Sequence, residues 1–265
     1  MNPYHSSTIA VAIAHFRTDP TVLALLLSGS IAHGFETRDS DVDLFVLLTE
    51  EAYAARVESR QLTFVSTELA TYPGGFIDAK YLSLDFMRQV AERGSEAARY
   101  AFDGVKVMFS REGFDVGELE GVIGEVVKYP VEGKAERVRR FRAQLEEWRC
   151  FCGEARKKGN EYLLGLAVRK LVLFGGRLVL AHNEMLYPFH KWFLKVLEGA
   201  PEKPEGLMDC INRVLANPSG RNVEAFYVMI KDFQDWGEEP TEWGPQFMLD
   251  NGLTWMTDNT SVDDL

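Results

Sequence analysis

The sequence has little cysteine and no cationic leader. Its 265 residues include three cysteines, Cys150, Cys152 and Cys210, which are too few and too irregularly spaced for a disulfide framework or a structural zinc site. The chain begins without a basic segment ahead of an apolar run, which argues against a secretory signal peptide. Together these features predict a protein of the reducing cytoplasm.

Long apolar runs are also absent. The most apolar stretch, residues 161–182, is interrupted by Arg169, Lys170 and Arg177. A helix of about 20 residues that spans lipid does not readily accept three cationic side chains. We therefore expect no membrane partner.

Positive charge is scarce as well. Lys and Arg number 29 against 40 Asp and Glu, which gives a formal net charge of -11. Such a surface repels the nucleic-acid backbone and excludes a bulk nucleic-acid binder. The hydrophobic content of 46% is that of a globular protein, and the length suits one large or two modest domains.

Short apolar runs in the first half of the chain predict a sheet. The run over residues 22–27 stops at Ser28, Gly29 and Ser30, as expected of a buried strand that ends in a tight turn. The other predicted strands are residues 43–48, 62–67, 76–82 and 105–109. A leading helix is predicted over residues 7–17, and Ser83 is expected to cap another.

From about residue 120 the pattern becomes helical. Apolar residues from Val138 to Cys152 recur at three- and four-residue steps, which predicts one face of a long helix. Further helices are predicted at residues 163–180, 189–197, 207–215 and 223–233, followed by an irregular tail that holds Trp236, Trp243 and Trp255. We expect an α+β protein in which a small mixed sheet flanked by helices, residues 1–118, precedes a helical bundle, residues 119–265.

Residues 25–48 carry the most informative motif. Gly29-Ser30 ends one predicted strand, and Asp41-x-Asp43 stands at the head of the next. Because side chains alternate along a strand, both carboxylates face the same side and suit hard magnesium ions. Two such ions can hold a triphosphate and neutralise departing pyrophosphate. Gly29 lets the backbone approach a phosphate, and Ser30 adds a hydroxyl donor.

This arrangement resembles the polymerase-beta-like nucleotidyltransferase superfamily, whose signature is a strand, Gly-Ser, a helix and Asp-x-Asp on the next strand. In its two-domain plan the chain is most similar to the aminoglycoside and lincosamide nucleotidyltransferases. The resemblance implies an enzyme that uses two Mg²⁺ ions and a nucleoside triphosphate, ATP by analogy, to modify a small-molecule acceptor such as an antibiotic. It also allows a homodimer, since a second subunit sometimes closes the cleft in such relatives.

The resemblance further implies a third carboxylate on a neighbouring strand, which ligates a metal or accepts a proton. Asp78 is preferred, and Glu68 is the alternative. Lys80 shares the face of Asp78 and is a candidate contact for the triphosphate. Ser40 lies close enough to Asp41 to meet a phosphate, although such a short polar side chain often caps a turn. His33 is expected at the surface.

Two alternatives remain open from the sequence. Arg177 and His182 have the spacing of HEPN helical domains, some of which are RNA-cutting toxins that pair with minimal nucleotidyltransferases. The chain would then act on RNA or on a partner protein. A nucleotide-binding module without catalysis is the second alternative, although the metal-ligating carboxylates are present. The sequence does not identify the acceptor.

Overall fold

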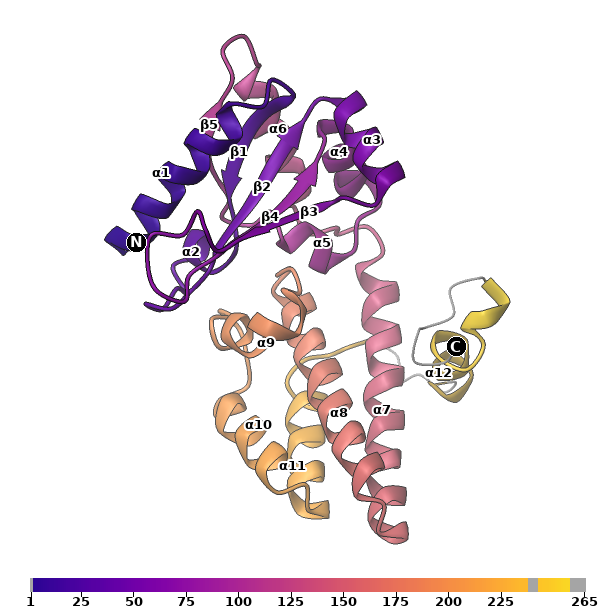
Figure 1. The fold of residues 1–265 in the computed structure, drawn as a ribbon. Helices are drawn as coiled ribbons and strands as arrows, with labels where there is room; N and C mark the ends of the chain where they lie inside the picture. The colour runs from indigo at the N-terminus through magenta and orange to yellow at the C-terminus, as the bar shows by residue number, and fades with distance from the viewer. Residues whose placement is uncertain (1, 238–242, 258–265) are drawn as a thin grey trace. The chain divides into compact units, whose positions relative to one another are not determined.

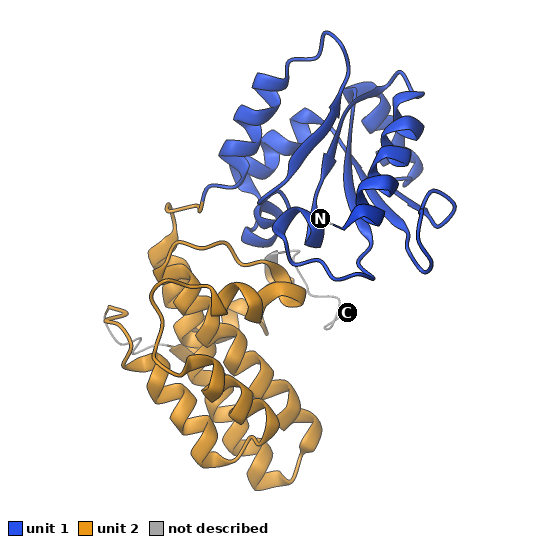
Figure 2. Cartoon of the chain, turned by 90° about the vertical axis from the view of Figure 1, so that its left-hand side faces the viewer, with its two compact units in different colours: residues 1–128 blue, residues 129–265 orange. Residues whose placement is uncertain are grey.

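The computed structural model describes residues 2–237 and 243–257. The chain forms two compact units, Met1–Lys128 and Tyr129–Leu265 (Figure 2). Within the described ranges, unit 1 holds the sheet and its helices, and unit 2 is helical. The predicted α+β class, with a small mixed sheet followed by a helical region, is confirmed.

Unit 1 is built on a five-stranded sheet of order β3-β4-β2-β1-β5. The strands are β1 (Val22–Leu27), β2 (Val42–Leu48), β3 (Thr63–Ser66), β4 (Ile77–Leu82) and β5 (Lys106–Ser110). β2 and β4 are parallel, and the other neighbouring strands are antiparallel. β1 ends where β2 and β4 begin, so three strand ends meet at one edge of the sheet.

Helices cover both faces of this sheet (Figure 1). The helices of unit 1 are α1 (Pro3–Arg17), α2 (Gly29–His33), α3 (Glu50–Ser59), α4 (Leu84–Arg93), α5 (Glu96–Tyr100) and α6 (Val116–Val126). Leu25 of β1 packs in one core with Phe16 of α1, and Leu26 packs in the other with Met87 of α4. Because β1 and β2 are buried on both faces, β1 reads as an unbroken apolar run, and β2 does so from Leu44 onward.

Helices α3 and α5 of unit 1 have no counterpart among the predictions. Helix α3 has no buried residue, so it lacks the apolar stripe by which a helix is recognised in sequence. Its start is marked by Thr49, whose hydroxyl accepts a hydrogen bond from the Ala52 amide at 3.3 Å. Helix α5 is five residues long, which is too short to show a helical period.

Unit 2 centres on a hairpin of two long helices that are joined through Gly159 and Asn160. Its helices are α7 (Lys134–Lys158), α8 (Glu161–His182), α9 (Phe189–Glu198), α10 (Leu207–Ala216), α11 (Gly220–Lys231) and α12 (Trp243–Asp250). Each predicted helix of this region is present. No helix in the described ranges has the length and apolar content that a membrane crossing requires.

The tail is more regular than the sequence indicates. Trp243 begins α12, and Trp255 lies in a 3₁₀ turn, η1 (Thr254–Thr257), so the expectation of an irregular tail is wrong for these segments. Phe247 of α12 packs edge-on against Trp148 of α7, with ring centroids 5.7 Å apart. This contact between distant parts of the chain stabilises a helix whose own eight residues carry a weak pattern.

Close helix packing in unit 2 depends on glycines in α8. A Cβ added at Gly175 would lie 2.7 Å from Cζ of Phe226 and 3.1 Å from Cγ1 of Ile230. Both side chains are fully buried on α11. α11 therefore packs against α8 at a distance that only glycine permits.

Gly175→Ala should lower the free energy of unfolding by about 1 to 3 kcal/mol, because the added methyl overpacks a filled core. Helix propensity alone predicts the opposite sign, a gain of about 1 kcal/mol. Gly153→Ala on α7 is the matched control, since nothing lies within 4 Å of its added Cβ. Urea unfolding of both variants separates the effects, and a stabilised Gly175→Ala protein would contradict the packing described.

Candidate functional site

The turn after β1 brings Gly29 and Ser30 to the sheet edge. Ser28 is extended, and Gly29, the first residue of α2, adopts a positive φ of 63°. The Ser28 amide donates to the Asp43 carbonyl at 3.0 Å, which ties this turn to β2. With five residues α2 has only a small macrodipole, so an anion here would be held by individual donors rather than by the field of a long helix.

The carboxylate of Asp43 lies directly over Gly29. A Cβ built on Gly29 would lie 1.9 Å from Oδ2 and 2.5 Å from Cγ of Asp43. No side chain fits at position 29 while the carboxylate keeps this place. Glycine is therefore required for two independent reasons, the positive φ and the contact.

The predicted carboxylates gather at the same edge. Asp43 is the register partner of Asp78 across the parallel strands β2 and β4, and Asp41 directly precedes β2. All three are partly exposed, whereas Val42 between the first two is buried. Glu68, the alternative third carboxylate, is exposed in the turn after β3. The strand register thus places Asp78 rather than Glu68 opposite Asp43.

Asp78 is engaged by its neighbour on β4. Lys80 Nζ donates to Oδ2 of Asp78 at 3.0 Å, and the two side chains share a face as the alternation predicts. Lys80 therefore neutralises a carboxylate at the site and leaves Oδ1 of Asp78 outside this ion pair.

The donor set fits a magnesium ion carried with a nucleotide. Among the described residues, no group of three or more His, Cys, Asp or Glu side chains is spaced to hold a metal. Magnesium is usually held by one or two carboxylates together with substrate phosphates and water, so two carboxylates such as those of Asp41 and Asp43 would suffice as the protein's contribution. The predicted ligand role of Asp78 stays a prediction.

Ser30, which directly follows Gly29, has a buried hydroxyl group. The residue is 4% exposed, and its Oγ has no hydrogen-bond partner among the described residues. A buried hydroxyl without a partner costs about 1 to 3 kcal/mol. The hydroxyl beside the glycine turn therefore suits a ligand that brings its own acceptor oxygen, as a phosphate does.

Ser40 is already engaged within its own turn. Its Oγ accepts a hydrogen bond from the Thr37 amide at 2.9 Å and lies 3.4 Å from the Thr37 hydroxyl. These contacts close the turn ahead of Asp41, which is the capping role that short polar side chains often have. Its nucleotide contact stays a prediction.

Nothing in the sequence pointed to Tyr72, yet this residue contacts the loop that leads into Asp41. Its hydroxyl donates to the Ser40 carbonyl at 2.5 Å. Partial burial, together with the negative charges of Asp41 and Asp39, raises the pKa of Tyr72. The only sequence signal nearby is the Pro73-Gly74-Gly75 turn, which places a loop here without indicating what its tyrosine contacts.

His33 fastens α2 rather than lying at the surface, so the expected surface position is wrong. Its Nδ1 lies 2.8 Å from the Gly29 carbonyl, and its Nε2 lies 3.3 Å from Oδ2 of Asp103. The ring stacks on Tyr100 with centroids 5.0 Å apart, and the side chain is 10% exposed. The contact with Asp103 raises the pKa of His33, while burial acts in the opposite direction.

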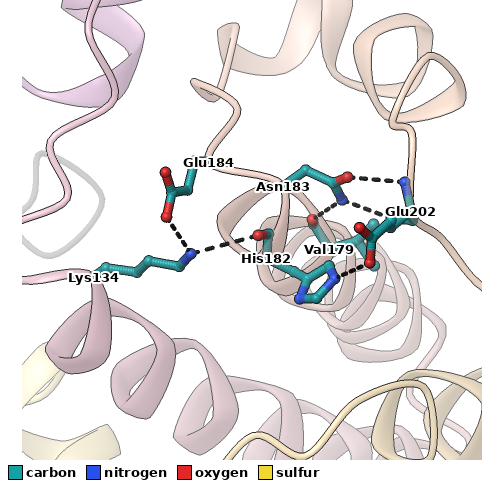
Figure 3. A network of polar contacts seen from close by, with 6 residues as sticks. All are labelled: Lys134, Val179, His182, Asn183, Glu184 and Glu202. Atoms are coloured by element: carbon teal, nitrogen blue, oxygen red, sulfur yellow. Dashed lines mark hydrogen bonds and ion pairs between the residues drawn. The ribbon is translucent and has the colours of Figure 1, made fainter.

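Arg177 and His182 do not form a joint site in unit 2. The Arg177 guanidinium packs over the rings of Phe141 and Tyr187 at 4.4 and 4.3 Å from their centroids. His182 Nε2 lies 2.8 Å from Oε2 of Glu202 (Figure 3). Five helical positions separate the two side chains by roughly 140° around the axis of α8. Each side chain thus has its own structural partners.

The polar network around His182 joins the end of α8 to two other segments (Figure 3). Asn183 donates to the Glu202 carbonyl at 2.7 Å and accepts from the Glu202 amide at 2.9 Å. Lys134 at the start of α7 pairs with Glu184 at 2.8 Å. These contacts fix the loop after α8 within unit 2.

Gly29→Ala should destabilise the protein by several kcal/mol, because left-handed strain of about 1 kcal/mol adds to a clash with the Asp43 carboxylate. Gly34→Ala is the matched control, since Gly34 also has a positive φ, of 72°, and nothing lies within 4 Å of its added Cβ. Thermal unfolding of both variants isolates the clash. Equal losses in the two variants would contradict the placement of Asp43 over Gly29.

The His33 contact predicts a pH dependence of stability. Because the folded-state pKa of His33 is raised above 6.5, its contribution is complete below the unfolded pKa and is lost as pH rises through the folded pKa. The free energy of unfolding should therefore fall between about pH 6 and pH 8. Asp103→Asn should flatten this slope in urea unfolding, and an unchanged slope would contradict the assignment.

Comparison with known proteins identifies the class of unit 1. Residues 13–95, which include Gly29, Ser30, Asp41, Asp43 and Asp78, match the family model of the nucleotidyltransferase domain. Among solved structures, the chain is similar to a nucleotidyltransferase-like protein from Exiguobacterium sibiricum 255-15, with 11% identity and a TM-score of 0.45 over 86% of this chain and 73% of that chain. No curated protein matches the chain. The chain contains a nucleotidyltransferase domain, and this domain identifies it as a nucleotidyltransferase.

Proposed function

We propose that this nucleotidyltransferase depends on magnesium and transfers AMP from ATP to a hydroxyl of a small molecule such as an antibiotic, with release of pyrophosphate. The observation that carries the proposal is the convergence of Asp41 and Asp43 with the Gly29-Ser30 turn at one sheet edge. Carboxylates supply oxygen ligands for a hard cation, and the buried Ser30 hydroxyl supplies a donor for a phosphate.

Each residue at the edge has a defined task in this reaction. Asp41 and Asp43 would hold magnesium, which when bound neutralises the triphosphate and its departing pyrophosphate. Ser30 donates its hydroxyl proton to a phosphate oxygen that approaches over the glycine turn. These groups orient the α-phosphorus toward the acceptor, and positioning of this kind is a large part of phosphoryl-transfer catalysis.

Asp78 is proposed to accept the acceptor's proton. The acceptor oxygen forms a bond to the α-phosphorus, the bond from that phosphorus to the pyrophosphate oxygen breaks, and the hydroxyl proton passes to Oδ1 of Asp78. Lys80 holds the other oxygen, Oδ2, at 3.0 Å and so orients the carboxylate. This division of work follows the general requirement that a base lie within hydrogen-bond reach of the proton it removes.

A cationic acceptor such as an aminoglycoside suits the overall charge of the chain. A net charge of -11 attracts polycationic small molecules and speeds their encounter with the protein. The helical region that follows the sheet is proposed to bind this acceptor, in line with the resemblance to the antibiotic-modifying enzymes. A cytoplasmic location fits both the three free thiols and the supply of ATP.

The toxin alternative receives less support. An RNA-cutting HEPN site needs its arginine and histidine to act on one phosphate, whereas Arg177 packs on aromatic rings and His182 pairs with Glu202. A non-catalytic nucleotide-binding module is also less supported, because the two carboxylates that catalysis needs are present beside the glycine turn.

Asp43→Asn and Asp41→Asn should each reduce pyrophosphate release by about 100-fold or more, because removal of one charged group from a phosphoryl-transfer site has effects of this size. The assay combines each of ATP, GTP, CTP and UTP with magnesium and a panel of aminoglycosides and lincosamides. Mass spectrometry then identifies the product that has gained a monophosphate.

Asp39→Asn is the matched control, since Asp39 is an exposed carboxylate in the same loop and has no assigned role. It should retain the wild-type rate. A wild-type chain that binds no nucleoside triphosphate in the presence of magnesium would overturn the proposal. An Asp43→Asn variant that works at the wild-type rate would overturn the assigned site.

A further inference from the structure

The turn that carries Tyr72 is fastened to helix α1. The Thr71 amide donates to Oγ1 of Thr8 at 3.0 Å, and the two threonine hydroxyls lie 2.9 Å apart. Thr71 Oγ1 also donates to the Tyr4 carbonyl at 3.1 Å. Thr8 is fully buried, so the anchor on the α1 side is rigidly placed. The position of residues 71–75 is therefore set by α1, 63 positions away in sequence.

The ring of Tyr72 has two close neighbours, His5 and Gly75. It meets the edge of His5 with centroids 5.3 Å apart and an interplanar angle of 73°. It also lies so close to Gly75 that a Cβ there would lie 2.4 Å from Cε2 and Cζ of the ring. Because the ring is fixed in this way, its hydroxyl group has one defined position.

That hydroxyl reaches the residue before Asp41. It donates to the Ser40 carbonyl at 2.5 Å, and on the other side of Asp41 the Val42 amide donates to the Phe76 carbonyl at 3.0 Å. Segment 72–76 thus holds the backbone on both flanks of Asp41. The bond to Val42 belongs to sheet pairing, whereas the bond to Ser40 is supplied by one side chain.

The backbone at Asp41 needs this additional hydrogen bond more than the backbone at Asp43 does. Asp43 lies within β2 and is paired in register with β4, but Asp41 ends the loop between α2 and β2. Within that loop, the Ser40 amide is bonded to the Thr37 carbonyl at 3.3 Å, which closes a local turn without tying it to the sheet. A ligand on a loop binds a cation well only if the loop is already in place.

We propose that Tyr72 is a positioning residue for Asp41, and that its hydrogen bond to the Ser40 carbonyl sets the affinity of the site for the divalent cation. The inference rests on the proposed magnesium-dependent function. Tyr72 acts through Asp41 and contacts neither nucleotide nor acceptor. Removal of its hydroxyl should weaken cation binding. At saturating cation concentration, the complex should still catalyse the reaction.

Tyr72→Phe keeps the ring and removes the hydrogen bond. The dissociation constant for Mg²⁺, measured by titration calorimetry with a saturating non-hydrolysable ATP analogue, should rise about 2- to 10-fold, which is the effect of losing one neutral hydrogen bond. The half-saturating Mg²⁺ concentration for pyrophosphate release should rise by the same factor. The rate at saturating Mg²⁺ should return to near the wild-type value, which a general loss of structure would not allow.

Tyr53→Phe is the matched control, because Tyr53 is a partly buried tyrosine of the same unit that packs on Phe86. It should not change the Mg²⁺ titration.

In an Asp41→Asn background, Tyr72→Phe should have no further effect on the dissociation constant. If Tyr72→Phe does not fold by circular dichroism, Thr71→Val loosens the same turn while keeping the tyrosine, and should shift the Mg²⁺ titration in the same direction by a smaller factor.

Three outcomes would overturn the inference. A Tyr72→Phe protein that folds and titrates like wild type would reject the positioning role while leaving the proposed function intact. A further loss in the Asp41→Asn background would show that Tyr72 does not act through Asp41. A wild-type chain that binds neither Mg²⁺ nor the ATP analogue would reject both proposals together.

Discussion

The carboxylate of Asp43 lies over Gly29, and the site depends on this contact. It lets the turn after β1 approach the first residues of β2 more closely than any side chain at position 29 would permit. The Ser28 amide bonds to the Asp43 carbonyl and fixes the same approach through the backbone. The glycine turn, which is proposed to bind phosphate, and the proposed cation ligand are thereby held next to each other.

The layered packing of unit 1 places these polar groups at an edge. Both faces of β1 and β2 are covered by helices, so polar side chains are tolerated where strands begin or end. β1 ends at the edge where the parallel strands β2 and β4 begin. Strand pairing therefore collects Gly29, Asp43 and Asp78 without any contact specific to a ligand. Tyr72 then links the turn anchored on α1 to the Ser40 carbonyl, directly before Asp41.

Helices and strands with many buried residues were predicted more accurately than those with few. Strands 22–27 and 43–48 were predicted to within one residue, because burial on both faces leaves unbroken apolar runs at residues 22–27 and 44–48. Helix α3 has no fully buried residue and was not predicted. Helix α12 was predicted as irregular, because Phe247 gains its partners from α7, about a hundred positions earlier. His33 was expected at the surface, since its stacking on Tyr100 is a contact between distant segments.

The sequence by itself determined the α+β class, the glycine turn and the Asp41-x-Asp43 pair, because burial, turn chemistry and alternation are local properties of the chain. Only the tertiary structure decided that Asp78 faces Asp43 across β2 and β4 and that Arg177 and His182 have separate partners. It also decided the bond from Tyr72 to Ser40, 32 positions apart. Such contacts depend on strand register and on how a turn is anchored, and no local pattern encodes either.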